Sequence, residues 1–259
     1  MLCPAATQVE GMTDPSHVFV ITALVFLLAG FVKGVIGLGL PTVAMGLLGA
    51  VMAPAQAAAL LIIPSFVTNV WQLLTGPRFW PLVRRLWPMM VGVCVGTWAG
   101  AGLLSADTTG RATMALGIAL VLYAAVSLAA VRFRVPAGAE WWLSPLVGGA
   151  TGVVTGATGV FVIPAVPYLQ ALNLDKEELV QALSLSFTVS TLALAAGLMR
   201  EGVLATSMAG TSLLALAPSL VGMFIGQYLR LRVQPPVFRR WFLIGLLVLG
   251  AYLAIKSWL

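Results

Sequence analysis

Three polar side chains share one face of a predicted helix inside the otherwise apolar stretch "IIPSFVTNVWQ". Ser65, Asn69 and Gln72 are spaced at i, i+4 and i+7, so in a helix they point in the same direction. A hydroxyl and two amides are neutral donors, which suit a small oxyanion that must bind and then leave. Ser186 and Ser190 in "LSLSFTVS" repeat the first two positions. Hydrogen bonding between helices without any ligand is the alternative interpretation.

Two glycine-rich segments add further candidate groups for binding. Glycine lets the backbone approach a ligand closely, and threonine adds a hydroxyl. The glycines could instead serve tight helix packing, and the threonines could bond back to their own helix. The candidate residues of these segments are Gly37, Gly39, Thr42, Thr155, Gly156, Thr158 and Gly159.

Lys33 is the one formal charge well inside an apolar block. An ionisable residue within a membrane segment is a candidate for function by default, and here it would attract an anion. Alternatively, its long side chain reaches the headgroups at the far end of the helix. Both interpretations stay open from the sequence.

The sequence lacks the residues that several kinds of chemistry require. The eight Asp and Glu residues all lie in the N-terminal tail or in predicted loops, so no carboxylate pair lies at depth to act as general acid and base. One histidine and two distant cysteines do not make a zinc site, and no "GxxxxGKS" phosphate loop is present. The sequence therefore predicts no catalytic residue, no metal, no cofactor and no nucleic-acid partner.

The elements that must position these groups are membrane helices. Of 259 residues, 60% are hydrophobic and 8% are charged, and the mean hydropathy is +1.03, which is outside the range of ordinary soluble domains. The start is acidic, so we predict a short extracytoplasmic tail, 1–16, and no cleaved signal. The apolar blocks are 17–52, 54–76, 86–105, 112–131, 141–172, 179–199, 203–229 and 241–258.

The blocks 17–52 and 141–172 are long enough for two short helices each, and each carries a glycine-rich interruption. Lipid offers no hydrogen bonds, so such a break must face protein or a water-filled cavity. If both blocks return to the side they entered, ten Lys and Arg residues share one face and three take the other, as the positive-inside rule requires. The ten are Arg78, Arg84, Arg85, Arg132, Arg134, Lys176, Arg230, Arg232, Arg239 and Arg240, and the three are Arg111, Arg200 and Lys256.

This sidedness divides the chain into halves 17–134 and 135–259 with an odd number of membrane elements each, so the second half is inverted. An internal repeat fits: "GFVKGVIGLGLP" from Gly30 aligns with "GGATGVVTGATG" from Gly148. Further matches join Ser65-Phe66 to Ser186-Phe187, and Gly92, Gly96 and Gly100 to Pro218, Gly222 and Gly226. Chance recurrence of the Gly-x-x-x-Gly spacing is the alternative. We predict an all-α polytopic fold of two inverted repeats, typical of secondary transporters.

The duplicated glycine motif, followed in each half by a polar helix, resembles the TauE/SafE sulfite exporter family over about residues 17–258. The resemblance implies a multi-pass protein of the bacterial inner membrane that moves sulfite, sulfonates or related small anions. Since the starts of half-helices attract anions, we expect binding near the midplane. Export driven by the membrane potential is the favoured mechanism, because no intramembrane carboxylate relays protons. A proton- or sodium-coupled carrier, a passive channel and a structural membrane subunit are the alternatives, and the oligomeric state is left open.

Overall fold

The computed structural model describes residues 15–105, 110–129, 134–204, 206–230 and 235–256. The predicted tail lies almost wholly outside these ranges, as do Arg132 and Arg232. All regular structure in the described part of the chain is helical. The helices are α2 (Pro15–Ile36), α3 (Leu40–Leu48), α4 (Pro54–Thr75), α5 (Phe79–Gly100), α6 (Gly102–Ser105), α7 (Arg111–Leu128), η1 (Ala137–Ala139), α8 (Glu140–Thr158), α9 (Ala165–Ala171), α10 (Lys176–Arg200), α11 (Thr206–Leu229) and α12 (Pro235–Lys256).

Seven of the described helices are long and apolar enough to cross a membrane: α2, α4, α5, α7, α10, α11 and α12. Large apolar side chains such as Leu24, Trp80 and Leu146 lie exposed on the molecular surface, where lipid rather than water must cover them. α8 has a similar length, 19 residues, but glycine and threonine take the place of large apolar residues in it. The all-α, multi-pass membrane fold expected from the sequence is confirmed.

Each half contains the broken helical element that the glycine-rich segments predict. α2 ends at Ile36, and α3 begins at Leu40 after Gly37 and Gly39, whose φ angles are +86° and +112°. In the second half, α8 ends before Gly159, which has φ +70°, and α9 begins only at Ala165. Glycine adopts these left-handed conformations without a steric penalty.

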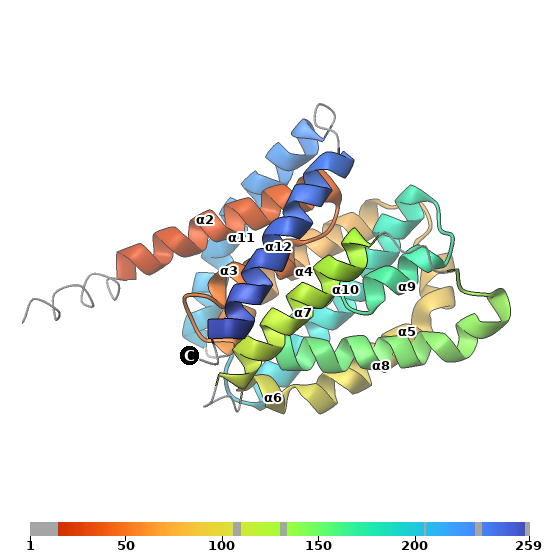
Figure 1. Ribbon diagram of the computed structural model, residues 1–259, viewed down its shortest axis with the longest axis horizontal. Helices are drawn as coiled ribbons and strands as arrows, with labels where there is room; N and C mark the ends of the chain where they lie inside the picture. The colour runs from red at the N-terminus through yellow and green to blue at the C-terminus, as the bar shows by residue number, and fades with distance from the viewer. Residues whose placement is uncertain (1–14, 106–109, 130–133, 205, 231–234, 257–259) are drawn as a thin grey trace, which may run out of the picture.

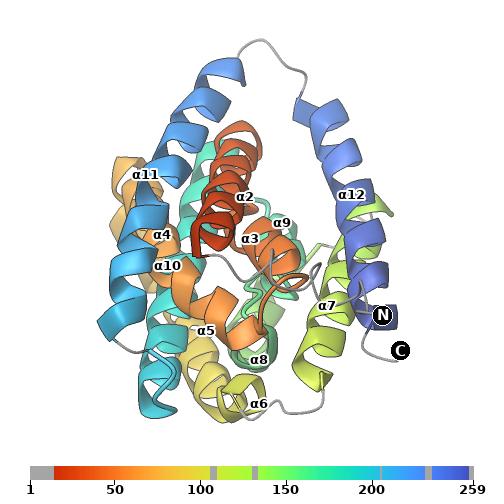
Figure 2. The same cartoon turned by 90° about the vertical axis from the view of Figure 1, so that its left-hand side faces the viewer.

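The intervening segment of the second break is enclosed by protein. Val160, Phe161 and Val162 are fully buried. The hydroxyl of Thr158 accepts a hydrogen bond from the N–H of Val160 at 3.2 Å, and the carbonyl of Val162 accepts one from the N–H of Val166 at 2.9 Å. Backbone interrupted at membrane depth is tolerated under this condition. Figure 2 shows the short helices α3 and α9 in the interior, between α11 on one side and α7 and α12 on the other.

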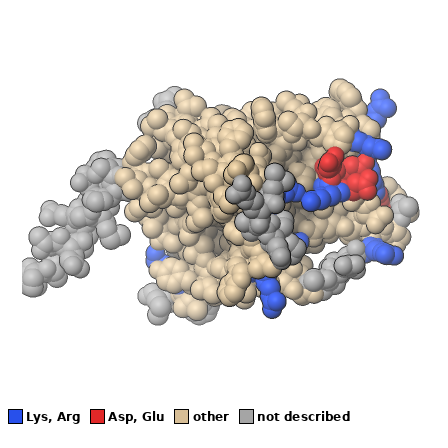
Figure 3. Space-filling model, turned by 90° about the horizontal axis from the view of Figure 1, so that it is seen from above, with Lys and Arg blue, Asp and Glu red and all other residues tan. Residues whose placement is uncertain are grey.

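Most of the described cations gather at one end of the molecule, which we call the cationic end. Arg78 pairs with Glu178 at 3.0 Å and Arg85 with Glu140 at 2.7 Å, which joins the starts of α5, α8 and α10. Figure 3 shows charged side chains crowded toward this end and a broad surface of neither sign beyond it. Four further cations of this end line one shared pocket: Lys176, Arg230, Arg239 and Arg240.

Lys256 marks the opposite end, where its ammonium donates to the carbonyl of Ala50 at 3.0 Å. α4 therefore runs toward the cationic end and α10 runs away from it. α2 and α8 likewise run in opposite directions, as do α5 and α11 (Figure 1). Opposed directions are what inverted halves require, and the repeat itself stays a prediction.

Two helix interfaces use glycine in the same way. α8 packs on α5, and α2 packs on α11 (Figure 1). A Cβ on Gly148 would collide with the carbonyl oxygen of Met89, and one on Gly30 would collide with that of Ser219. Backbones approach this closely only where side chains are absent. The glycines of the two interfaces therefore face their partner helices at equivalent positions.

The register of these contacts differs by one helical turn from the alignment expected for α5 and α11. Gly92 lies against the carbonyl of Pro145, whereas Gly222 lies against that of Leu27. Given the Gly30–Gly148 match, the contacts make Gly92 the counterpart of Gly222, and Gly96 that of Gly226. Glycines spaced four residues apart align equally well after a shift of one helical turn. For this reason the sequence alignment paired Gly92 with Pro218. In the observed register, Pro218 corresponds instead to Pro88, the proline in the interior of α5.

Candidate functional site

A chain of buried polar groups links three helices; we call Lys33, Asn69, Ser65 and Thr191 the polar cluster. The Lys33 ammonium donates to Oδ1 of Asn69. Nδ2 of Asn69 donates to the Ser65 hydroxyl at 3.1 Å, and that hydroxyl lies 3.2 Å from the hydroxyl of Thr191. All four side chains are at most 1% exposed. The cluster is thus closed off from solvent and from lipid.

The break in the first half sets the position of Lys33. Lys33 lies in the last turn of α2, where its carbonyl accepts the N–H of Gly37 at 2.7 Å. Ser65 and Asn69 lie one turn apart on α4, as their spacing predicts, and α10 packs against this face. The ammonium points inward to Asn69, so the alternative in which Lys33 reaches the headgroups does not describe this structure.

Thr191 was not anticipated from the sequence. Its hydroxyl also donates to the carbonyl of Phe187 at 2.6 Å, a local bond that any helical threonine can make. Thr191 follows Ser190 directly, so it projects about 100° around the helix from it. The contact between α4 and α10 is what brings it to Ser65.

The corresponding positions in the second half are hydroxyls; we call Thr151, Ser186 and Ser190 the hydroxyl set. By the alignment of the halves, Thr151 corresponds to Lys33, Ser186 to Ser65 and Ser190 to Asn69. These three hydroxyls are buried, and none has a hydrogen-bond partner among the described residues. A buried hydroxyl without a partner costs roughly 1–3 kcal/mol, so each is a place where a ligand or a water would be stabilised.

Two further buried hydroxyls lack a partner in the described part of the chain, those of Thr42 and Thr97. Thr42 lies in the first turn of α3, directly after the first break. Thr97 lies on α5 at the interface with α8, and Gly152 faces its backbone N–H.

Thr42 was predicted as a site residue, whereas Thr97 and Thr151 were missed. Thr97 is a lone threonine in an apolar helix and carries no pattern. Thr151 lies in the glycine-rich segment from which only Thr155 and Thr158, nearer the break, were selected.

The predicted threonines of α8 bond locally. The Thr155 hydroxyl donates to the carbonyl of Thr151 at 2.7 Å, and the Thr158 hydroxyl donates to that of Val154 at 2.6 Å. This is the back-bonding alternative raised from the sequence. Gly156 packs against the backbone of Gly100 on α5, which fits the alternative of tight helix packing. Gly159 ends α8 with a positive φ angle.

Gln72 lies apart from the polar cluster. Its Oε1 accepts a bond from the hydroxyl of Ser184 at 3.3 Å, nearer to the cationic end. The buried amide beside it, Gln181, is also taken up by structure, because it donates to the carbonyl of Leu73 at 2.8 Å and accepts the N–H of Arg78 at 2.9 Å. Gln181 thereby ties the end of α4 to α10.

The electrostatics of the polar cluster are unbalanced. No ion pair joins Lys33 to a carboxylate within the described residues, and its partner Asn69 is neutral. A charge held in a low-dielectric interior is costly unless an opposite charge accompanies it. The arrangement can therefore stabilise an anion, with hydroxyl and amide groups available for its oxygens.

Comparison with known proteins agrees with this chemistry. The sequence profile described as "Sulfite exporter TauE/SafE" matches residues 22–253 of the chain. No match was found among curated proteins or among solved structures. The matched region includes both breaks, the polar cluster and the hydroxyl set. This chain, with its two broken helices and its buried lysine, therefore belongs to the sulfite exporter TauE/SafE family of membrane proteins.

Proposed function

We propose that this protein is a secondary transporter that exports a small sulfur oxyanion, of the sulfite or sulfonate type, across the bacterial inner membrane. Membership of the family supports the transport of a sulfur compound. The observation that supports a negatively charged substrate is the burial of Lys33 against a neutral amide. An anion next to this ammonium would supply the opposite charge that the described residues lack.

The proposed binding site consists of buried side-chain groups that make no hydrogen bond to the backbone of their own helix. Lys33 supplies the charge, Asn69 and Ser65 supply an amide and a hydroxyl, and Ser186, Ser190 and Thr42 supply hydroxyls without partners. Gly37 and Gly39 shape the backbone between Lys33 and Thr42. Sites near the midplane, built around broken helices, are usual in secondary transporters. Five other candidate residues support this site through packing and local hydrogen bonds and do not contact the anion: Gln72, Thr155, Gly156, Thr158 and Gly159.

Competition for Lys33 gives the site a way to release its ligand. In the described structure the ammonium bonds to Asn69, so an arriving anion replaces that bond and a departing anion restores it. Neutral donors bind an oxyanion less strongly than a second cation would. A carrier requires such balance, because a ligand that binds too firmly does not leave.

The membrane potential is sufficient to drive export. With the cytoplasm negative, moving one negative charge outward gains roughly 2.3 kcal/mol per 100 mV, which is about a fiftyfold bias at equilibrium. Coupling to protons or sodium is the second candidate. It is favoured by one observation, the burial of the titratable Lys33 side chain, which would change its charge during the cycle.

Flux from proteoliposomes separates the two mechanisms. Sulfite is loaded inside, and a potassium gradient with valinomycin makes the interior negative at constant pH without sodium. We expect efflux to accelerate with the size of the potential. Efflux that ignores the potential and follows an imposed pH or sodium gradient would replace uniport with symport. Equal flux of sulfite from protein-free liposomes would remove the proposal altogether.

A further inference from the structure

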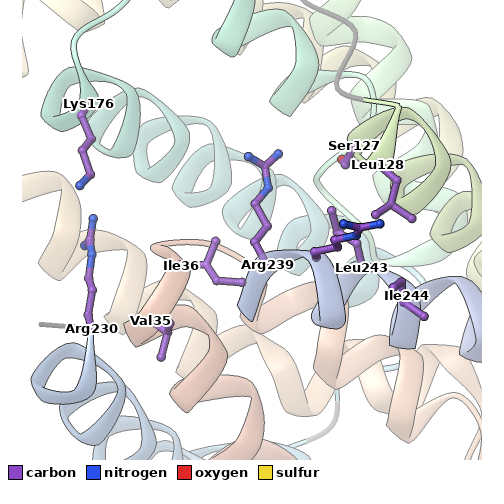
Figure 4. A pocket seen from close by; sticks show the side chains of 10 residues that line it. Val35, Ile36, Ser127, Leu128, Lys176, Arg230, Arg239, Leu243 and Ile244 are labelled. Carbon is purple, nitrogen blue, oxygen red and sulfur yellow. The ribbon is translucent and has the colours of Figure 1, made fainter. Parts of the chain in front are cut away.

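The cationic end contains a pocket that the proposed transport site does not use. It has a volume of about 720 Å³ and is lined by cations from three places in the fold. Lys176 begins α10, Arg230 follows α11, and Arg239 and Arg240 lie in the first turns of α12. We call it the cationic pocket. Figure 4 shows Lys176 and Arg230 pointing toward each other, and Arg239 reaching into the same space.

No acid is among the described residues that line the pocket. Asp175 and Glu177 flank Lys176 in the sequence, but no ion pair joins any of the four cations to a carboxylate in the described part of the chain. Nearby acids pair with other arginines of this end: Glu178 with Arg78 and Glu140 with Arg85. Like charges that point at one another repel, and the repulsion is relieved when an anion lies between them. The pocket therefore favours an anion by its composition alone.

The remaining walls strengthen that preference and indicate where the pocket leads. Leu243 and Ile244 give it an apolar side, and low-dielectric walls concentrate the field of nearby charges. Val35 and Ile36 form another part of the lining. They are the last two residues of α2, directly before the break at Gly37 and within one turn of Lys33. One wall of the cationic pocket is thus formed by the same turn of α2 that carries Lys33.

We propose that the cationic pocket is a second oxyanion-binding site, an antechamber in which the substrate collects before it reaches Lys33. This inference rests on the proposed transport function for its role, but the binding itself does not. The shared ligand chemistry is a sulfonate-like or phosphate-like oxyanion. Two sources can supply it, the free anion from solution or the headgroup of an anionic lipid.

The first experiment measures anion preference without transport. In a variant with both native cysteines, Cys3 and Cys94, changed to Ser, the pocket residue Ser127 is changed to Cys. Its reaction rates with a sulfonatoethyl and a trimethylammonioethyl methanethiosulfonate are compared, relative to free cysteine. We expect an anion preference of about tenfold or more, since focused charge raises such rates by 10–10³. The preference should fall several-fold with R239Q/R240Q and with added salt.

Arg84→Gln is the matched control, because Arg84 is an exposed cation of the same end that lies outside the cationic pocket. It should leave the preference at Ser127→Cys unchanged. An anion preference below about twofold, or one that R239Q/R240Q leaves intact, overturns the proposed site. Neither result depends on whether the protein transports sulfite, so the proposed function is tested separately.

The second experiment identifies the source of the oxyanion. Sulfite flux is measured in liposomes of neutral phosphatidylcholine, with and without anionic phosphatidylglycerol. A KM raised at least threefold by R239Q/R240Q in neutral lipid, with unchanged maximal rate, assigns the pocket to the free anion. An unchanged KM with loss of the response to phosphatidylglycerol assigns it to a lipid headgroup. If R239Q/R240Q alters neither property, the antechamber is wrong.

Discussion

Lys33, Asn69 and Ser65 of the polar cluster lie in the first half, and the hydroxyl set lies at the positions that the predicted repeat aligns with them, but the two regions differ in chemistry. Lys33, Asn69 and Ser65 bond to one another, whereas Thr151, Ser190 and Ser186 find no partner among the described residues. The first region carries a charge and its polar groups are hydrogen-bonded. The second region is neutral, and its buried hydroxyls have no hydrogen-bond partner among the described residues. The packing around both is alike, because the same glycine register joins α2 to α11 and α8 to α5.

This difference indicates how a duplicated scaffold can make a single asymmetric site. Two lysines at corresponding depths would repel each other and would hold an anion too firmly. A lysine in one half and hydroxyls in the other supply one charge with several neutral donors. In the proposed site, the first half would recognise the charge of the ligand, and the second half would add hydrogen bonds to its oxygens.

The largest expected effect comes from removing the charge that separates the two regions. We expect Lys33→Met to lower the rate of sulfite flux in proteoliposomes by roughly 10- to 150-fold, because a hydrogen bond to a charged group contributes about 1.5–3 kcal/mol. Methionine fills similar space without a buried charge, so the variant should fold. The counterpart change, Thr151→Val, should cost less than about fivefold. Wild-type flux with Lys33→Met would make the polar cluster a purely structural feature.

The next prediction concerns what the two halves share. Gly30→Ala and Gly148→Ala each place a methyl group against the backbone of a neighbouring helix, at Ser219 and at Met89. Overpacking of this kind costs about 1–3 kcal/mol, or about 2–4 °C of Tm per kcal/mol for a chain of this size. Thermal unfolding in detergent should show similar losses for both variants.

Gly245→Ala on α12 is the control for that comparison, since no atom lies within 4 Å of the added methyl group. Its Tm should equal or slightly exceed that of the wild type, because alanine favours a helix over glycine by up to about 1 kcal/mol. A loss confined to Gly30→Ala or to Gly148→Ala would mean that the two interfaces are not equivalent in energy.

The smallest effect should distinguish a bonded group from an unbonded one. Ser190→Ala removes a buried hydroxyl that has no hydrogen-bond partner among the described residues, so the Tm should stay unchanged or rise. The lost donor should still slow sulfite flux about two- to tenfold, the equivalent of one hydrogen bond of about 0.5–1.5 kcal/mol. Asn69→Ala should lower both flux and Tm, because Lys33 and Ser65 lose their shared partner. A Ser190→Ala variant with full flux would remove this hydroxyl from the site.

Sequence patterns predicted the features that depend on local chemistry. The breaks after Ile36 and after Thr158 follow from glycine-rich segments inside apolar blocks, and the shared face of Ser65 and Asn69 follows from helical spacing. The side of the membrane assigned to Arg78 and Arg239 agrees with their position at one end of the molecule.

Features that depend on contact between distant segments were not accessible. The partner of Ser65 is Thr191, which no spacing within α10 indicates. The cationic pocket joins residues from α10, α11 and α12, so the arginines were visible in the sequence only as markers of sidedness. Because the glycines recur every four residues, the sequence alignment of α5 with α11 was also wrong by one helical turn.

The composition of α8 has a consequence for the synthesis of the protein. Six glycine and threonine residues between Gly148 and Gly156 let α8 lie against α5, but they also make α8 less apolar than the seven long helices. Lipid alone therefore favours its insertion weakly. We expect α8, presented singly to the insertion machinery, to stay outside the bilayer more often than α2 does, as a glycosylation-mapping assay would reveal. Its insertion would then depend on α5, which is synthesised earlier and is already in the membrane when α8 packs against it.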